Sequence, residues 1–267
     1  MNIIKLQEQK HDIKIGKECP YFEPNIKEDC LLEVDSNIVG FYIKDVSKYS
    51  TKLSQLISIS NKEFRSENVP KQEMSRGPQG TKADKAQREK DGKNLVTQFS
   101  TILGSVAPKP HMRRPYPTIS SVHREKKANT FIKAMWAASV ESEKIIKQLT
   151  PKIYEEQLEL FKDVNKKWRF GNLFTSSISN FNIAAAYHRD TGNIVGAVNV
   201  ILTKRNNSNG GCLNVPDYNV TFEQADNSML VYPAWKNIHG VTPIIKTAED
   251  GYRNSLIFYP LKAFKGI

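Results

Sequence analysis

Cysteine is scarce in this chain, and apolar runs are short. Three cysteines in 267 residues cannot form a disulfide framework, and no Cys-x-x-Cys pair offers a zinc site: Cys19, Cys30 and Cys212. The apolar run Phe181–Tyr187 is far shorter than the roughly 20 residues of a membrane helix. Residues 1–8 become polar before an apolar stretch of secretory length appears. We therefore expect no membrane span and reduced thiols in a cytoplasmic or nuclear protein.

Acidic residues are outnumbered, and this imbalance points to polyanionic partners. The chain has 39 Lys and Arg against 28 Asp and Glu, a formal net charge of +11. A positive field of this size attracts polyanions, of which nucleic acid is the commonest. Biased codon usage also produces lysine-rich chains, so charge alone leaves the partner open.

The N-terminal quarter carries a strand-and-helix pattern and then loses its apolar residues. Asn37–Ile43 is typical of a strand, and the apolar spacing over 46–59 predicts a helix. Between residues 62 and 93 Ile, Leu, Tyr and Trp are absent, which predicts a mobile basic loop or linker. It is either a plain solvated linker or a loop that orders on phosphates. We accordingly expect an accessory segment over 1–61 that packs on a main domain over 94–267.

The main domain changes its hydrophobic period partway along. Residues 123–168 predict two helices separated by Thr150-Pro151, a good cap and first helical position. From 171 to 262 the pattern has period two and is punctuated by turn signals. The candidate strands are Phe174–Ile178, Phe181–Arg189, Gly196–Thr203, Gly211–Val215, Val220–Phe222, Ser228–Pro233 and Arg253–Pro260. The fold class expected is α+β, with helices packed on an antiparallel sandwich or barrel.

Two of the five histidines lie in positions suited to binding a metal. His188 and Asp190 end a strongly apolar strand, and residues two apart on a strand face the same side. His239 follows another apolar strand, 49 residues later. Two imidazoles and one carboxylate form the facial triad of non-haem iron(II) oxygenases.

A possible carboxylate-binding pair follows the second histidine. Arg253 and Ser255 lie on one face at the start of the last predicted strand. A guanidinium binds a carboxylate through two hydrogen bonds, and a nearby hydroxyl adds a third. This is what the far carboxylate of a keto-diacid needs, although Arg253 could equally be a surface cation.

Several blocks together resemble a known family. They are Phe174-Thr175-Ser176, His188-Arg189-Asp190-Thr191-Gly192-Asn193, Gly210-Gly211-Cys212-Leu213, His239-Gly240-Val241-Thr242-Pro243 and Arg253-Asn254-Ser255 with Tyr259. In this order they resemble the iron(II)/2-oxoglutarate dioxygenases of the TET/JBP type, which oxidise the 5-methyl group of pyrimidines in DNA. The resemblance implies a double-stranded β-helix, or jelly roll, and a dioxygenase domain over 94–267.

The resemblance also implies a set of site residues. Iron(II) would be held by His188, Asp190 and His239, and 2-oxoglutarate by Arg253 with Ser255; O₂ is the remaining co-substrate. Asn193 matches a position that hydrogen-bonds the target base, and Tyr259 an aromatic that stacks on it.

One departure concerns the choice of base. Cytosine-directed members carry a base-reading His two residues after the stacking aromatic, where this chain has Leu261. We expect hydroxylation of 5-methylcytosine in DNA, with the base flipped out of the duplex and a monomeric enzyme. Alternatives are thymine hydroxylation, an oxygenase of the same fold with a non-DNA substrate, and a non-catalytic jelly roll that binds nucleic acid.

Overall fold

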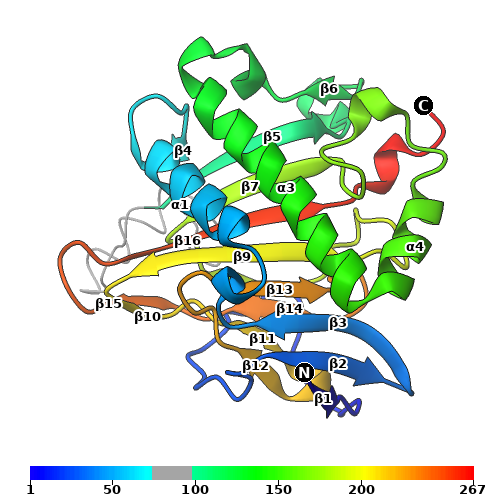
Figure 1. Cartoon of the computed structure of the whole chain (residues 1–267), viewed down its shortest axis with the longest axis vertical. Helices are drawn as coiled ribbons and strands as arrows, with labels where there is room; N and C mark the ends of the chain where they lie inside the picture. The colour runs from blue at the N-terminus through cyan, green and yellow to red at the C-terminus, as the bar shows by residue number, and fades with distance from the viewer. Residues whose placement is uncertain (74–97) are drawn as a thin grey trace.

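The computed structural model describes residues 1–73 and 98–267, in which two facing sheets are covered on one side by helices (Figure 1). The larger sheet has the strand order β1-β2-β3-β13-β9-β16-β7-β5-β4, with β6 paired to β5. Its strands are β1 Asn2–Lys5, β2 Cys30–Val34, β3 Asn37–Ile43, β4 Gln72–Glu73, β5 Phe99–Val106, β6 Thr118–Ile119, β7 Ser176–Phe181, β9 Asn199–Asn206, β13 Met229–Tyr232 and β16 Tyr252–Tyr259.

The smaller sheet carries the order β12-β11-β14-β8. Its strands are β8 Ala185–His188, β11 Leu213–Val215, β12 Val220–Phe222 and β14 His239–Val241. A separate hairpin joins β10 Ser208–Gly210 to β15 Ile244–Lys246. All of these pairings are antiparallel. Apart from the parallel pair β1 and β2, both sheets are antiparallel and pack face to face as a jelly roll, which confirms the α+β fold class expected.

In the part of the chain that the structure describes, three α-helices cover the outer face of the larger sheet (Figure 1). They are α1 Thr51–Arg65, α3 Asn129–Leu149 and α4 Pro151–Leu160; short 3-10 helices are η1 Val46–Lys48, η2 Pro110–Met112, η3 Ser121–Arg124, η4 Lys126–Ala128, η5 Lys166–Trp168, η6 Pro216–Tyr218 and η7 Lys262–Phe264. The Ser50 hydroxyl accepts a hydrogen bond from the Leu53 amide and so caps α1. Helix α4 begins at Pro151, as the sequence predicts. The helices leave the space between the sheets free for a site.

Several element ends differ from the sequence prediction, and three of these differences change how the chain is divided into elements. Helix α1 continues to Arg65, into the predicted basic loop, because Phe64 packs on Phe131 in the core. The second helix ends at Leu160 rather than near residue 168. The predicted strand 181–189 is divided, because Asn182 has a left-handed backbone (φ 56°) that sends β7 and β8 into different sheets. The rest of the predicted loop from 74 to 93 lies outside the described residues.

Strand β5 is a finding that the sequence pattern did not predict. Four prolines between residues 108 and 117 made the surrounding segment look irregular, yet Phe99–Val106 pairs with β7 along six residues. Residues 30–43 are also hydrogen-bonded into the larger sheet, since β3 pairs with β13. The division of the chain at residues 61 and 93 stays a prediction. Among the described residues, no helix has the length and apolar character needed to cross a bilayer.

Candidate metal centre

A cavity of about 1200 Å³ lies between the two sheets. Strands β7, β8, β9, β14 and β16 contribute to its lining, together with Ile15–Pro20 from the N-terminal region. Every site residue predicted from the sequence lines this cavity: His188, Asp190, Asn193, His239, Arg253, Ser255 and Tyr259. The fold therefore brings predicted site residues from three separate segments of the chain to one place.

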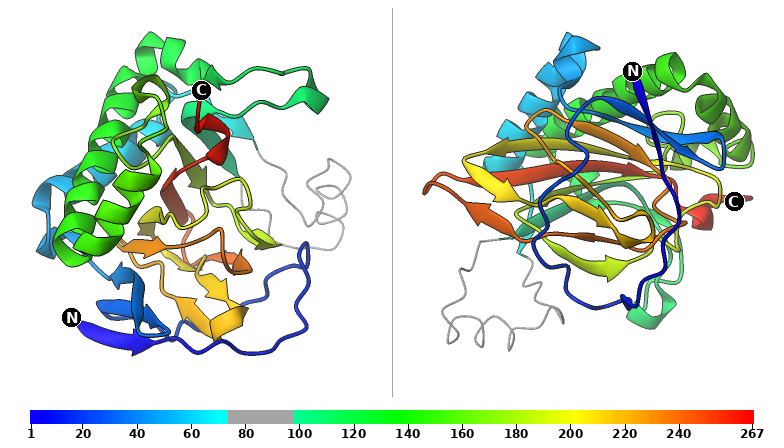
Figure 2. Two further views of the ribbon diagram at one scale, coloured as in Figure 1. Left: turned by 90° about the vertical axis from the view of Figure 1, so that its right-hand side faces the viewer. Right: turned by 90° about the horizontal axis from the view of Figure 1, so that it is seen from below.

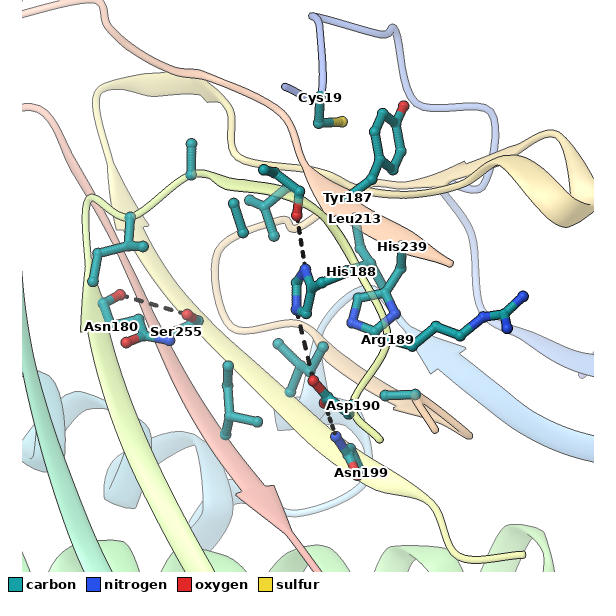
Figure 3. A pocket seen from close by; sticks show the side chains of 18 of the residues that line it. Cys19, Asn180, Tyr187, His188, Arg189, Asp190, Asn199, Leu213, His239 and Ser255 are labelled. Atoms are coloured by element: carbon teal, nitrogen blue, oxygen red, sulfur yellow. Dashed lines mark hydrogen bonds and ion pairs between the residues drawn. The ribbon is translucent and has the colours of Figure 1, made fainter. Parts of the chain in front are cut away.

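The two histidines face each other across a strand pair. His188 ends β8, His239 begins β14, and the two are register partners, with ring centroids 4.4 Å apart. Asp190 follows β8 directly, and its Oδ1 lies 3.6 Å from His188 Nε2. One ligand atom from each of the three residues lies within 4.8 Å of the others. Figure 3 shows the three side chains converging while Arg189, between two of them, points away.

Hydrogen bonds orient both imidazoles. Nδ1 of His188 lies 2.8 Å from the Ala186 carbonyl oxygen, and Nδ1 of His239 lies 3.1 Å from that of Asn237. A carbonyl only accepts, so each Nδ1 carries the proton and donates it, which leaves each Nε2 lone pair for a metal.

Burial keeps the second imidazole in the form that binds metals. His239 is 4% exposed, and burial lowers its pKa, with a further contribution from neighbouring His188. A lowered pKa favours the neutral ring, which is the ligand form. Two imidazoles and one carboxylate are a donor set that fits iron(II) and leaves coordination positions open.

The carboxylate of Asp190 is held by a short chain of amides. Asn199 on β9 donates from Nδ2 to Asp190 Oδ2 at 2.9 Å, and Asn193 donates from Nδ2 to Asn199 Oδ1 at 2.8 Å. The second oxygen, Oδ1, is the one that points towards His188. Asn199 was missed by the sequence prediction, since nothing in the pattern marks it. Partners of this kind orient metal ligands.

We expect Asn199→Ala to weaken metal binding by about tenfold, the lower end of the usual cost of losing an outer partner of a metal ligand. The Asp190 carboxylate then loses its only side-chain donor among the described residues. Titration with Co(II), followed by its visible absorption, measures the affinity. Asn206→Ala, on the exposed end of the same strand, is the matched control and keeps normal affinity. Equal affinities in both variants would exclude an orienting role for Asn199.

Arg253 is a buried cation without a counter-ion. Its side chain is 3% exposed, its Nε has no hydrogen-bond partner, and no carboxylate among the described residues pairs with it. Burial first, and then the charge of the nearby Arg205, lower the pKa of Arg253 to about 10. An unpaired buried charge is costly, so the site fits an anionic ligand. Ser255, also in the cavity, makes only a 3.5 Å contact to the Asn180 carbonyl.

Arg205 on β9 is the register partner of Arg253 on β16, but its guanidinium is already hydrogen-bonded to backbone groups. Its guanidinium donates to the carbonyl oxygens of Gly210, Gln224 and Ser208. Gly211 stands beside Arg253 with φ +64°, and a Cβ there would lie 2.9 Å from Arg253 Cδ. Of these two cations, only Arg253 is buried and free to bind an anion.

Tyr259 and Leu261 also line the cavity. Burial raises the pKa of Tyr259, and its hydroxyl contacts Ser176, so the ring is neutral. Leu261 forms an isolated bridge with Asn193. The position where cytosine-directed relatives are expected to carry a His is therefore an apolar part of the cavity wall.

A jelly roll whose cavity holds two imidazoles, a carboxylate and a buried arginine is the arrangement of a non-haem oxygenase. A family model described as the oxygenase domain of the 2OGFeDO superfamily, Tet_JBP, matches residues 94–262, more than half of the chain. The chain belongs to this family. It is an oxidoreductase that depends on iron(II), 2-oxoglutarate and O₂.

The chain is similar to several solved structures, of which NgTET1 supports the fold. NgTET1 in complex with 5mC DNA has a TM-score of 0.59 at 12% identity, covering 99% of this chain and 83% of that one. A 2OG-Fe(II) oxygenase family protein from Burkholderia pseudomallei has a TM-score of 0.43 at 12% identity, covering 82% and 83%. OsALKBH1 has a TM-score of 0.40 at 13% identity, covering 90% of this chain and 98% of that one. A search of curated protein sequences found no match.

Proposed function

We propose that this oxygenase hydroxylates the 5-methyl group of 5-methylcytosine in DNA. The observation that carries the proposal is the buried, unpaired Arg253 guanidinium in the same cavity as the His188, Asp190 and His239 cluster. Membership of the Tet_JBP family and the similarity to NgTET1, whose structure contains 5mC DNA, support the choice of substrate.

The roles of the site residues follow from their chemistry. Nε2 of His188, Nε2 of His239 and Oδ1 of Asp190 would hold iron(II). Arg253, helped by the Ser255 hydroxyl, would bind the far carboxylate of 2-oxoglutarate. When bound, iron, 2-oxoglutarate and O₂ supply the oxidising chemistry that converts a methyl C–H bond into C–OH, with succinate and CO₂ as by-products.

The amide chain at Asp190 favours cytosine over thymine. Asp190 can only accept, so Asn199 must turn its NH₂ group towards Asp190 and its oxygen towards Asn193. Asn193 must then donate to that oxygen, and its own amide oxygen accepts no hydrogen bond from the described residues. An acceptor at this place suits the exocyclic amino group of cytosine, whereas thymine has a carbonyl there. Tyr259 supplies a neutral ring on which a flipped base can stack.

A basic hairpin beside the cavity offers a contact for the DNA backbone. Residues 107–117 stand out from the body of the molecule between β5 and β6 (Figure 2). Ala107, at its base, packs in the same cluster as Leu261, which lines the cavity. Arg113 and Arg114 are exposed near its tip. Arginines in this position would bind the DNA phosphates on either side of a flipped base.

Nucleoside mass spectrometry tests this function. The protein is incubated with iron(II), 2-oxoglutarate and duplex DNA that contains either 5-methylcytosine or only unmodified cytosine and thymine. We expect 5-hydroxymethylcytosine from the methylated duplex alone, in amounts that require both iron(II) and 2-oxoglutarate.

Two outcomes would contradict the proposal. 5-Hydroxymethyluracil from the unmethylated duplex would assign thymine as the substrate, the alternative that Leu261 keeps open. Succinate formation with no modified nucleoside in either duplex would show an oxygenase with a non-DNA substrate.

A further inference from the structure

The N-terminal arm, residues 7–25, runs between β1 and β2 and passes along the smaller sheet (Figure 2). It lies outside the region matched by the family model, which begins at residue 94. Yet Ile15–Pro20 line the cavity that contains the metal cluster. The arm is therefore a wall of the site that the family resemblance does not account for.

The arm pairs with the strand that carries His188. The Gly16 amide donates to the Tyr187 carbonyl at 2.8 Å, and the Tyr187 amide donates to the Lys17 carbonyl at 2.9 Å. Strand β8 is an edge of the smaller sheet, so the arm satisfies its open hydrogen-bonding groups. Cys19 packs on Gly240, next to His239, so closely that a Cβ on Gly240 would lie 2.8 Å from Cys19 Cβ.

One carboxylate joins the arm to the loop before the second histidine. His11 Nδ1 accepts from the Ile13 amide, so its Nε2 carries the proton and donates to Asp217 Oδ1 at 2.6 Å. Asp217 Oδ2 accepts from Asn237 Nδ2 at 2.6 Å and from the Ile238 amide at 3.3 Å. Burial alone would raise the pKa of Asp217, but these hydrogen bonds lower it, so the carboxylate is charged.

The same loop orients the histidine. The Asn237 carbonyl accepts the Nδ1 proton of His239. A continuous chain of hydrogen bonds therefore runs from His11 through Asp217 and Asn237 to His239.

We propose that Asp217 is a positioning residue that couples the docking of the N-terminal arm to the metal affinity of His239. Release of His11 removes one of the donors that hold the Asp217 carboxylate against Asn237. The loop that orients the imidazole then becomes less constrained. Coupling between two sites is reciprocal, so metal binding must also hold the arm more firmly on the cavity. The inference rests on the proposed metal site.

Co(II) binding and proteolysis of the arm test this coupling without measuring turnover. We expect His11→Ala to weaken Co(II) binding about tenfold, as for other outer partners of a metal ligand. We also expect trypsin to cut faster after the exposed Lys14 and Lys17. His11→Gln, whose amide can still donate to Asp217, restores both values. Asp12→Asn, an exposed neighbour, is the matched control and changes neither.

The wild-type protein supplies a second test that does not depend on any variant. Saturating Co(II) is expected to slow cleavage at Lys14 and Lys17 relative to cleavage at Lys265, near the C-terminus. Faster arm cleavage in His11→Ala with unchanged Co(II) affinity, or no protection of the wild-type arm by Co(II), would overturn the coupling. Failure of the wild-type protein to bind Co(II) at all would instead overturn the metal site, and this inference with it.

Discussion

Asp190→Ala is expected to abolish both metal binding and turnover. It removes the only carboxylate of the cluster and leaves two imidazoles, which by themselves hold iron(II) poorly. The loss should exceed about a hundredfold, the upper end of what losing an outer partner costs. Co(II) titration measures the binding, and succinate release in the presence of iron(II) and 2-oxoglutarate measures the turnover.

The control for this variant removes an aspartate elsewhere. Asp226→Ala deletes a partly exposed carboxylate that pairs with Lys204, away from the cavity lining. We expect it to bind Co(II) and to turn over normally. Wild-type metal affinity in Asp190→Ala would show that Asp190 is not a ligand and would contradict the proposed metal centre.

Arg253→Met is expected to weaken 2-oxoglutarate binding without lowering the stability of the protein. Loss of one partner of a buried charged pair costs about 2 kcal/mol or more, which corresponds to at least about a thirtyfold higher Michaelis constant for 2-oxoglutarate. The protein without co-substrate should be at least as stable as wild type, because the variant removes a buried cation that has no counter-ion. Thermal unfolding with and without 2-oxoglutarate measures stability and binding, and succinate release at increasing 2-oxoglutarate concentrations measures the Michaelis constant.

Arg205 provides a matched control on the neighbouring strand. Its guanidinium donates to three backbone carbonyls, so Arg205→Met should lower the unfolding temperature without 2-oxoglutarate. If 2-oxoglutarate still raised the unfolding temperature of Arg253→Met as much as that of wild type, Arg253 would not be the anion-binding residue.

Much of the candidate site could be predicted from the sequence because several of its residues lie only two positions apart in the chain. His188 and Asp190 are two residues apart at a strand end, and Arg253 and Ser255 are two apart at a strand start, so local geometry alone sets each pair on one side. Asn199 and the arm residues could not be found this way. Their roles depend on contacts with distant segments, and a single asparagine or a polar stretch carries no periodic signal.

The sequence by itself determined the α+β class, the presence of three helices with the start of the last one at Pro151, and the types of side chain available for metal and carboxylate binding. Only the tertiary structure decided that His188 and His239 become register partners, that Arg253 is left without a counter-ion, and that His11 reaches Asp217 from 206 positions away. The physical reason is that strand register and loop placement follow from packing between segments far apart in the chain, whereas periodicity and capping act over a few residues.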